Sequence, residues 1–426
     1  MTSLNVLIIA YYFPPMGLSG VQRITKFVKY LPDLGWNPIV LTSNSPAYYA
    51  FDNSLLKEIE EKSVQIYRTE EDITKIVKKS SNPTLNYPSK FRQKIQSIVL
   101  QTLLQPDSRR LWAKQAIAKA EEIFKNHQID LIFATAPPFT DFLVAHHLSK
   151  KYEVPYVLDY RDLWVDNPYY FYATVFHKNY AISLEEKILM NASRSLVITR
   201  DMKNKILSRY RFLNYNDIAI LPHGYDQEDI DNAQVLAQKS KKFVIAHSGV
   251  FSADLTPEYF IKAVSSLINE KTEIKQDLEI RFVGVLQKKY KKLITKNNLD
   301  EFFKLYGYVE HIESVKILME SDVLWMMVPN SIVTPSRFYE YLGTRKPMII
   351  SSPPSELTKI VENSNSVIRT DFKDTNAIKK AILEKYTKWK NGKLTPISKE
   401  ITEKYERKSL TKQLAKELAY CVKFKQ

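Results

Sequence analysis

A short predicted helix near residue 340 carries an acidic side chain close to where a helix start can meet a ligand. In the stretch TPSRFYEYLGTRKPMI, Thr334 is a good N-cap, Pro335 fits the first helical position, and Gly343 would end the helix. The stretch follows the apolar run DVLWMMV and precedes PMIIS. Between two parallel strands, the free N–H groups and positive dipole end of such a helix face a ligand crevice. Glu340 is therefore either a ligand-binding carboxylate or a solvated side chain on a surface helix.

A second group of charged residues ends another apolar run. LDYRDLW places Asp159, Arg161 and Asp162 at the carboxyl end of a predicted strand, where crevice residues lie in α/β sheets. One Asp could accept a proton as a general base. The structural alternative is an Asp–Arg ion pair that caps the next helix.

Composition indicates two domains and no covalent cross-links. A chain of 426 residues with 44% hydrophobic content is too long for one ordinary core. Cys421 is the only cysteine, so no intrachain disulfide can form. The N-terminal NVLIIAYYF lacks the features of a signal peptide, and no apolar run approaches the ~18 residues of a membrane span. We therefore expect a cytoplasmic protein.

The net charge of +15 is concentrated in one region. Residues 75–125 contain eleven Lys or Arg and three acidic residues. Such a region suits an anionic substrate or an anionic membrane, or is a solvated face. No nucleic-acid-binding module accompanies it, so we expect no nucleic acid partner. Within it, SKFRQKIQSIVLQTLL (89–104) has apolar residues at helical spacing and a basic N-terminal end, which is typical of peripheral membrane docking or of a core helix with a snorkelling basic end.

Glycine is scarce, and most of it lies at the ends of predicted elements. The chain has nine glycines, although ~7% usage would give about thirty. Gly17 and Gly20 follow the first predicted strand, and Gly249 follows FVIAHS. Such positions allow a positive φ or close approach of the backbone to a ligand.

Predicted strands and helices alternate along the whole chain, which indicates α/β units with parallel, doubly wound sheets. The polar stretch 226–242 interrupts the alternation and is the expected linker. The expected strands are 4–10, 38–42, 64–68, 130–134, 155–160, 194–199 and 217–221 before the linker, and 243–248, 279–283, 303–306, 322–328 and 347–351 after it. The expected helices are 21–32, 110–126, 138–150, 179–191 and 200–209 before it, and 257–268, 286–297, 311–320, 335–342 and 375–389 after it.

Several motifs, in this order and spacing, resemble those of bacterial glycosyltransferases of the GT-B type in the family-4 group that builds capsule, O-antigen and exopolysaccharide. They are YYFPPMGLSGVQRITKFVKYLPDLGWNPIVLT, PDSRRLW, DLIFATAPPF, PYVLDYRDLWVDNPYY, ILPHGYD, HSGVF, IRFVGV, YGYVEH and PSRFYEYLGTRKP. The resemblance implies two Rossmann-like lobes: an N-terminal acceptor lobe (1–225) and a nucleotide-sugar lobe (243–396). It also implies a C-terminal helix (397–426) that crosses back to the first lobe.

The resemblance also assigns donor-binding roles. Glu340 would accept hydrogen bonds from both ribose hydroxyls, since a carboxylate offers two acceptor oxygens. Ser336 and Arg337, in the first helical turn, would meet the diphosphate. The remaining donor-side positions that the resemblance implies are Thr334, Gly17, Gly20, Gly249 and His223, with Arg23 beside the first two glycines.

Three positions depart from the family's pattern. Many relatives have a second Glu where this chain has Ile332, and many have an Arg and a Lys in the loop that here reads GVFSAD (249–254). The frequent acceptor-side His aligns best with Arg161. Asp229 and Asp231 match a metal-binding DxD pattern, but acidic helix starts are common in polar linkers. We expect no metal and no cofactor, with a nucleoside-diphosphate sugar as donor substrate.

The function that the resemblance implies is transfer of a sugar to a saccharide or lipid-linked acceptor in surface polysaccharide synthesis. Asp162, Asp159 and Arg161 are the candidate catalytic group, and the aromatic run Trp164, Tyr169, Tyr170 and Phe171 offers flat faces for an acceptor sugar. Two alternatives stay open: a sugar-nucleotide epimerase of the same fold and a catalytically inactive binding subunit. Donor sugar, nucleotide base, stereochemical outcome and oligomeric state stay open as well.

Overall fold

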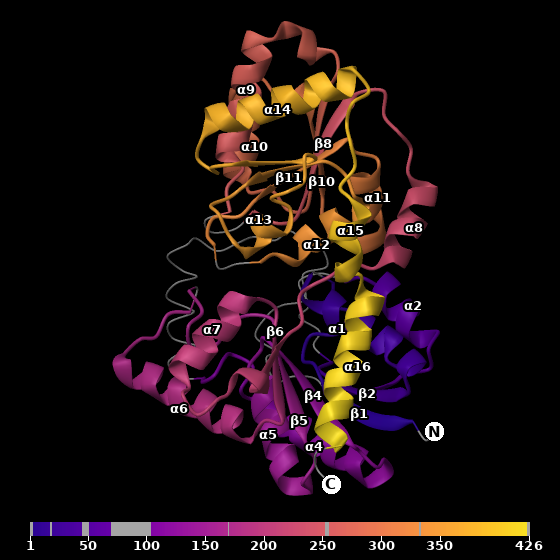
Figure 1. Ribbon diagram of the computed structural model, residues 1–426, viewed down its shortest axis with the longest axis vertical. Coiled ribbons are helices and arrows are strands. Elements are labelled where there is room, and N and C mark those ends of the chain that lie inside the picture. Colours follow the sequence, from indigo (N-terminus) through magenta and orange to yellow (C-terminus); the bar gives the residue numbers. More distant parts are fainter. Residues whose placement is uncertain are drawn as a thin grey trace. The chain divides into compact units, whose positions relative to one another are not determined.

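The chain folds into two compact α/β units (Figure 1). The computed structural model describes residues 3–17, 19–44, 51–69, 104–168, 170–251, 255–331 and 334–423. The first unit comprises Met1–Pro222 and Lys408–Gln426, and the second comprises His223–Arg407. Each unit contains one parallel sheet, of seven and six strands respectively, which confirms the predicted fold class.

The first unit is a seven-stranded sheet in the order β3-β2-β1-β4-β5-β6-β7. Its strands are β1 (Leu4–Ile9), β2 (Trp36–Thr42), β3 (Gln65–Arg68), β4 (Leu131–Ala136), β5 (Tyr156–Tyr160), β6 (Arg194–Val197) and β7 (Ile218–Ile220). Its helices are α1 (Ser19–Tyr30), α2 (Ser54–Glu60), α4 (Trp112–Asn126), α5 (Thr140–Tyr152), α6 (Val175–Asn191), α7 (Arg200–Arg209) and α16 (Arg407–Lys423).

Strand β1, which lies between β2 and β4 in this sheet, is buried on both faces, as parallel strands usually are. Leu7 and Ile9 of β1 point into the core that contains α4 and α5, while Val6 and Ile8 point into the core that contains α1 and α16. The C-terminal helix α16, yellow in Figure 1, therefore belongs to the first unit although it follows the second in sequence. Its core positions repeat every four residues: Leu410, Leu414 and Leu418.

The second unit has a six-stranded sheet in the order β10-β9-β8-β11-β12-β13. Its strands are β8 (Phe243–Ser248), β9 (Leu278–Val283), β10 (Phe303–Gly307), β11 (Val323–Met327), β12 (Met348–Ser351) and β13 (Val367–Thr370). Its helices are α8 (Gln227–Leu236), α9 (Glu258–Glu270), α10 (Lys288–Lys296), α11 (His311–Met319), α12 (Ser336–Thr344), α13 (Glu356–Ile360), α14 (Thr375–Lys390) and α15 (Lys399–Thr402).

The polar segment predicted as a linker contains a packed helix. Asp226 caps α8 by accepting a hydrogen bond from the Glu228 backbone N–H. Ile230 and Ala233 are buried beside Val315 of α11. Because only these two apolar residues mark the packed face of α8, the composition of the segment did not indicate a helix. The short elements α2, α13 and β13 were not predicted either.

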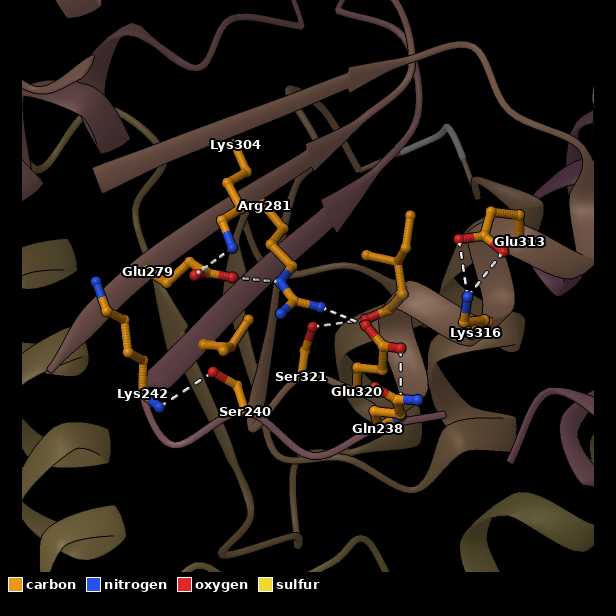
Figure 2. A network of polar contacts seen from close by, with 12 residues as sticks. Gln238, Ser240, Lys242, Glu279, Arg281, Lys304, Glu313, Lys316, Glu320 and Ser321 are labelled. Carbon is orange, nitrogen blue, oxygen red and sulfur yellow. Dashed lines mark hydrogen bonds and ion pairs between the residues drawn. The ribbon is translucent and has the colours of Figure 1, made fainter. Parts of the chain in front are cut away.

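A network of ion pairs fastens the segment after α8 to the second sheet (Figure 2). Arg281 of β9 pairs with Glu279 (2.7 Å) and with Glu320 (2.6 Å), and Lys304 pairs with Glu279 (2.8 Å). Glu320 also accepts a hydrogen bond from the Gln238 backbone N–H. Burial works against the charge of Glu279, but Lys304 and Arg281 hold its pKa below the ordinary value. Through Glu320, the network thus reaches Gln238 in the segment that follows α8.

None of the helices in the described ranges has both the length and the apolarity needed to cross a membrane.

Candidate functional site

The helix that the sequence analysis singled out forms at nearly the predicted bounds. It is α12, which begins at Ser336 and presents Phe338, Tyr341 and Leu342 to the core. Glu340 lies on the other face, with 14% of its side chain exposed, and its Oε1 is 2.9 Å from Nε2 of His311 on α11. Glu340 is therefore a partly buried, hydrogen-bonded carboxylate rather than a solvated surface side chain.

Arg337 lies one turn before Glu340 and reaches the carboxyl end of β8. Its Nη1 donates to the backbone carbonyl of Ser248 (3.1 Å) and to Nε2 of His247 (3.3 Å). His247 Nδ1 lies 3.0 Å from the Trp325 carbonyl, so this nitrogen carries the proton and Nε2 accepts. Burial, reinforced by Arg337, lowers the pKa of His247 to about 3, which keeps the imidazole neutral. The histidine therefore orients the guanidinium without competing for an anion.

Two glycines allow the backbone to pass close to this guanidinium. Gly249 has φ +138°, and a Cβ there would lie 1.5 Å from Nη1 of Arg337. Gly284 has φ +112°, and a Cβ there would lie 2.4 Å from the Gly249 carbonyl oxygen. Only glycine fits at either position, so the sequence signal at Gly249 has a specific structural cause.

Further residues of the second unit lie on this helix or beside it. Tyr341 accepts a hydrogen bond from the Ser248 backbone N–H (2.7 Å), which ties α12 to β8. Thr334 and Ser336 are partly exposed at the start of α12. His223 is buried edge-to-face against Tyr339, with ring centroids 6.1 Å apart. Ile332 lies outside the described residues.

In the first unit, Asp159 is part of a buried ion pair. Arg23 donates from Nη2 to Oδ1 (2.8 Å) and from Nε to Oδ2 (3.0 Å), and Thr135 donates to Oδ2 (2.7 Å). Arg23 also donates to the carbonyls of Leu221 and Pro222. Asp159 has 0% of its surface exposed and Arg23 has 1%. The Arg23 guanidinium is therefore used inside the first unit.

Within the described part of the chain, Arg161 forms no ion pair with its sequence neighbours. Its guanidinium donates to the backbone carbonyls of Gly20 and Pro137. Gly20 permits this approach, because a Cβ there would lie 3.3 Å from Nη1 of Arg161. The Asp–Arg pair foreseen as the structural alternative does exist, but it joins Asp159 to Arg23. Gly17 is buried after β1.

Asp162 is the exposed member of the charged group. Protein atoms nevertheless surround its carboxyl group closely enough that desolvation raises its pKa to about 6, while Arg161 opposes the rise. A carboxyl group that titrates near neutral pH and reaches solvent can accept a proton from a substrate. Of the three candidate catalytic residues, only Asp162 combines these properties.

Sequence reasoning missed a third carboxylate beside this group. Asp141, in the first turn of α5, is fully buried and accepts a hydrogen bond from the Tyr11 backbone N–H (2.9 Å). Burial raises its pKa well above the ordinary value. Within the described residues its Oδ1 has no hydrogen-bond partner, and the same holds for Nε of Arg161. The motif ATAPPF ends only two residues before Asp141, but nothing in its pattern marks the carboxylate.

The aromatic run does not form one open platform. Trp164 is 1% exposed and stacks on Phe139 in the core, with ring centroids 4.9 Å apart. Tyr170 packs against the same core, and Phe171 is 44% exposed. Tyr169 lies outside the described residues. The prediction that Trp164 offers a face to an acceptor is therefore wrong, because its side chain fills the interior.

The chain matches a known family over its N-terminal half. Residues 20–229 fit the family model described as Glycosyltransferase Family 4. This region resembles glycosyltransferase family 4. No curated protein matches the chain. The family match covers the buried Arg23–Asp159 pair and Asp162, and thus the whole charged group of the first unit.

Solved structures resemble this chain over nearly its full length. HepE of Anabaena in complex with UDP-glucose has 14% identity and a TM-score of 0.65, covering 98% of this chain and 100% of that chain. Sucrose-phosphate synthase of Thermosynechococcus elongatus has 15% identity and a TM-score of 0.64, covering 99% of each chain. The fold is GT-B.

A sugar-nucleotide epimerase shares this fold. UDP-GlcNAc 2-epimerase of Neisseria meningitidis, bound to UDP-GlcNAc, has 11% identity and a TM-score of 0.58, covering 98% of this chain and 100% of that chain. At such identities a likeness shows the fold alone. The family match over residues 20–229 is what favours a glycosyltransferase.

Proposed function

We propose that this protein transfers a sugar from a nucleoside-diphosphate sugar to a saccharide or lipid-linked saccharide acceptor in surface polysaccharide synthesis. The observation that carries the proposal is the pair Arg337 and Glu340, one turn apart on α12, with Arg337 seated on the Gly249 backbone at the carboxyl end of β8. A partly buried cation beside a hydrogen-bonded carboxylate suits a diphosphate joined to a ribose.

The second unit is the donor lobe in this proposal. Glu340 accepts the ribose hydroxyls, while Arg337 and the N–H groups at Ser336 bind the diphosphate. Thr334, Gly249 and His223 border the same helix. The GT-B neighbour bound to UDP-glucose supports a nucleotide-sugar donor.

Arg337 also supplies a positive charge beside the loop 249–254, which contains no Lys or Arg. Many members of the family that the sequence resembles have an Arg and a Lys after the first strand of this lobe. Residues 249–254 of this chain include neither. Here the guanidinium reaches the start of that loop from α12 and binds the Ser248 carbonyl. The positive charge is thus kept in place by a different element, which argues against a binding subunit that has lost its donor site.

The first unit is the acceptor lobe, and Asp162 is the group that receives the acceptor's proton. Its exposure and its pKa of about 6 suit that role. In this proposal Asp159 and Arg161 have structural roles and do not take part in the reaction. Asp159 forms an ion pair with Arg23, and Arg161 donates hydrogen bonds to the Gly20 and Pro137 carbonyls. We expect catalysis without a metal, so turnover should persist in EDTA.

The test uses purified full-length protein with UDP, GDP, ADP and CDP sugars. Melting shifts identify the donor, and nucleotide release is then measured with and without saccharide and lipid-linked acceptors. A transferase releases nucleotide in proportion to acceptor. An epimerase converts the sugar nucleotide without any acceptor, and a binding subunit gives a melting shift and no turnover; either result would overturn the proposal.

A further inference from the structure

Three helices of the second unit bring one imidazole between two carboxylates. His311 is the first residue of α11, and its Nε2 lies 2.9 Å from Oε1 of Glu340 on α12. Its Nδ1 lies 3.7 Å from Oδ2 of Asp229 on α8. The three side chains expose only 12–14% of their areas. This arrangement was not foreseen, although His311 ends the motif YGYVEH.

Apolar packing holds the imidazole in place. Ile230 follows Asp229, and Ile312 follows His311 in sequence. Both isoleucines pack in one small cluster with Ala233 and Val315, which joins α8 to α11. Because each polar residue is next to a packed residue, the geometry of the polar contact is set by the core beneath it.

The hydrogen bond restricts the conformation of Glu340. A glutamate side chain loses rotamer freedom when it binds a ligand, and this loss weakens binding. A carboxylate already held at one oxygen has less freedom to lose. Each carboxylate oxygen has two lone pairs, so a bond from His311 is compatible with further bonds from a diol.

We propose that His311 is a positioning residue that holds the Glu340 carboxylate in the orientation that binds the ribose hydroxyls of the donor. Asp229 lies on the other side of the ring, with Oδ2 3.7 Å from Nδ1, which is an ion-pair distance for a protonated imidazole and too long for a hydrogen bond. The inference rests on the proposed function, in which Glu340 is the ribose anchor. It assigns His311 a contribution to recognition of the ribose and none to recognition of the diphosphate, which is the task of Arg337.

The experiment compares ribose and 2′-deoxyribose nucleotides. Calorimetric titration measures Kd for whichever of UDP, GDP, ADP or CDP binds wild type most tightly, and for its 2′-deoxy counterpart. The variants are Glu340→Ala, His311→Ala, His311→Gln, and the double variant. Gln can place a side-chain N–H close to the position of His Nε2, so His311→Gln is the rescue. Glu313→Ala, on the same helix and paired at the surface with Lys316, is the matched control.

We expect His311→Ala to weaken binding of the ribonucleotide by about fivefold or more and the 2′-deoxy form much less. His311→Gln should restore most of the loss, and Glu313→Ala should change neither Kd. Adding His311→Ala to Glu340→Ala should cost little more, because the positioning residue then has nothing to position. A purely structural role would weaken both nucleotides equally and would show as a lower melting temperature.

The outcomes separate this inference from the proposed function. If Glu340→Ala leaves the preference for ribose unchanged, or if none of the four nucleotides binds, the donor site itself is wrong. If Glu340→Ala removes the preference and His311→Ala does not, only the role of His311 is overturned. If His311→Ala raises Kd by the same factor in the Glu340→Ala background as in wild type, the role of His311 is likewise overturned.

Discussion

Nη1 of Arg337 lies 1.5 Å from the point at which a side chain of Gly249 would begin. A side chain at position 249 would therefore collide with the guanidinium. Arg337 can keep this conformation only while residue 249 is glycine. This relationship gives a structural reason for the glycine that follows FVIAHS in a chain with only nine glycines.

Gly249→Ala should displace the Arg337 guanidinium and strain a backbone at φ +138°, at a cost of about 1–3 kcal/mol in stability. Donor nucleotide affinity should fall with it. Gly392→Ala is the matched control, since φ is +64° there and nothing lies within 4 Å of its Cβ. We expect both variants to melt earlier and only Gly249→Ala to lose nucleotide affinity in titration calorimetry. Unchanged affinity in Gly249→Ala would remove Arg337 from the donor site.

Asp159→Asn should destabilise the protein by about 3–5 kcal/mol, because it leaves the Arg23 guanidinium buried without its counter-charge. Turnover per folded molecule should stay near wild type. Asp33→Asn removes an exposed pair with Lys62, in which Asp33 is 49% exposed, and should cost at most about 1 kcal/mol. Urea unfolding and rates normalised to the folded fraction measure the two effects. A stable but inactive Asp159→Asn protein would make Asp159 catalytic after all.

Asp162→Asn should lower turnover by roughly 10² or more with donor affinity nearly unchanged. In wild type, kcat/KM should fall as pH drops below about 6, since the base must be ionised. The contribution of Asp162 to folding stability should change with pH in the opposite direction. The folded-state pKa is raised above the ordinary 3.8, so the folded protein binds this proton more tightly, and the stability it contributes is lost as pH rises from 3.8 through about 6. A pH–rate profile that keeps its acidic limb in Asp162→Asn would assign that limb to another group.

If the acceptor is lipid-linked, the protein should sediment with anionic vesicles at low salt and detach at high salt. This prediction rests on residues 89–104, of which 89–103 lie outside the described residues. Replacing Lys90, Arg92 and Lys94 by Gln should abolish sedimentation. The control replaces Lys288, Lys289 and Lys291 of α10, which tests whether any three positive charges suffice. Equal binding to neutral and anionic vesicles would contradict electrostatic docking.

The fold could be predicted from the sequence because the residues that mark each helix or strand lie within it or next to it in the chain. α7 at 200–209 and β8 at 243–248 match their predicted bounds, since periodicity and flanking polar residues mark each one. The segment 226–242 shows where this reasoning fails. α8 is stabilised by packing on α11, and a helix with two buried apolar positions leaves little periodic signal.

The candidate sites were only partly predictable, because their decisive contacts join residues far apart in sequence. Glu340 and Arg337 were found from one short stretch. The partner of Asp159 is Arg23, 136 residues away, and no local pattern distinguishes it from Arg161. Trp164 was misassigned for a similar reason, since whether an aromatic ring is in the core or at the surface depends on Phe139 and the sheet beneath it.

The most direct test of the account is titration of a nucleoside diphosphate into wild type and Glu340→Ala. The account predicts that wild type binds one of UDP, GDP, ADP or CDP, and that Glu340→Ala keeps its fold and loses about 1–3 kcal/mol of binding free energy, roughly a five- to 150-fold rise in Kd. The same Kd for a folded Glu340→Ala protein, or no binding to wild type, would contradict the donor site on which the proposed glycosyltransferase activity depends.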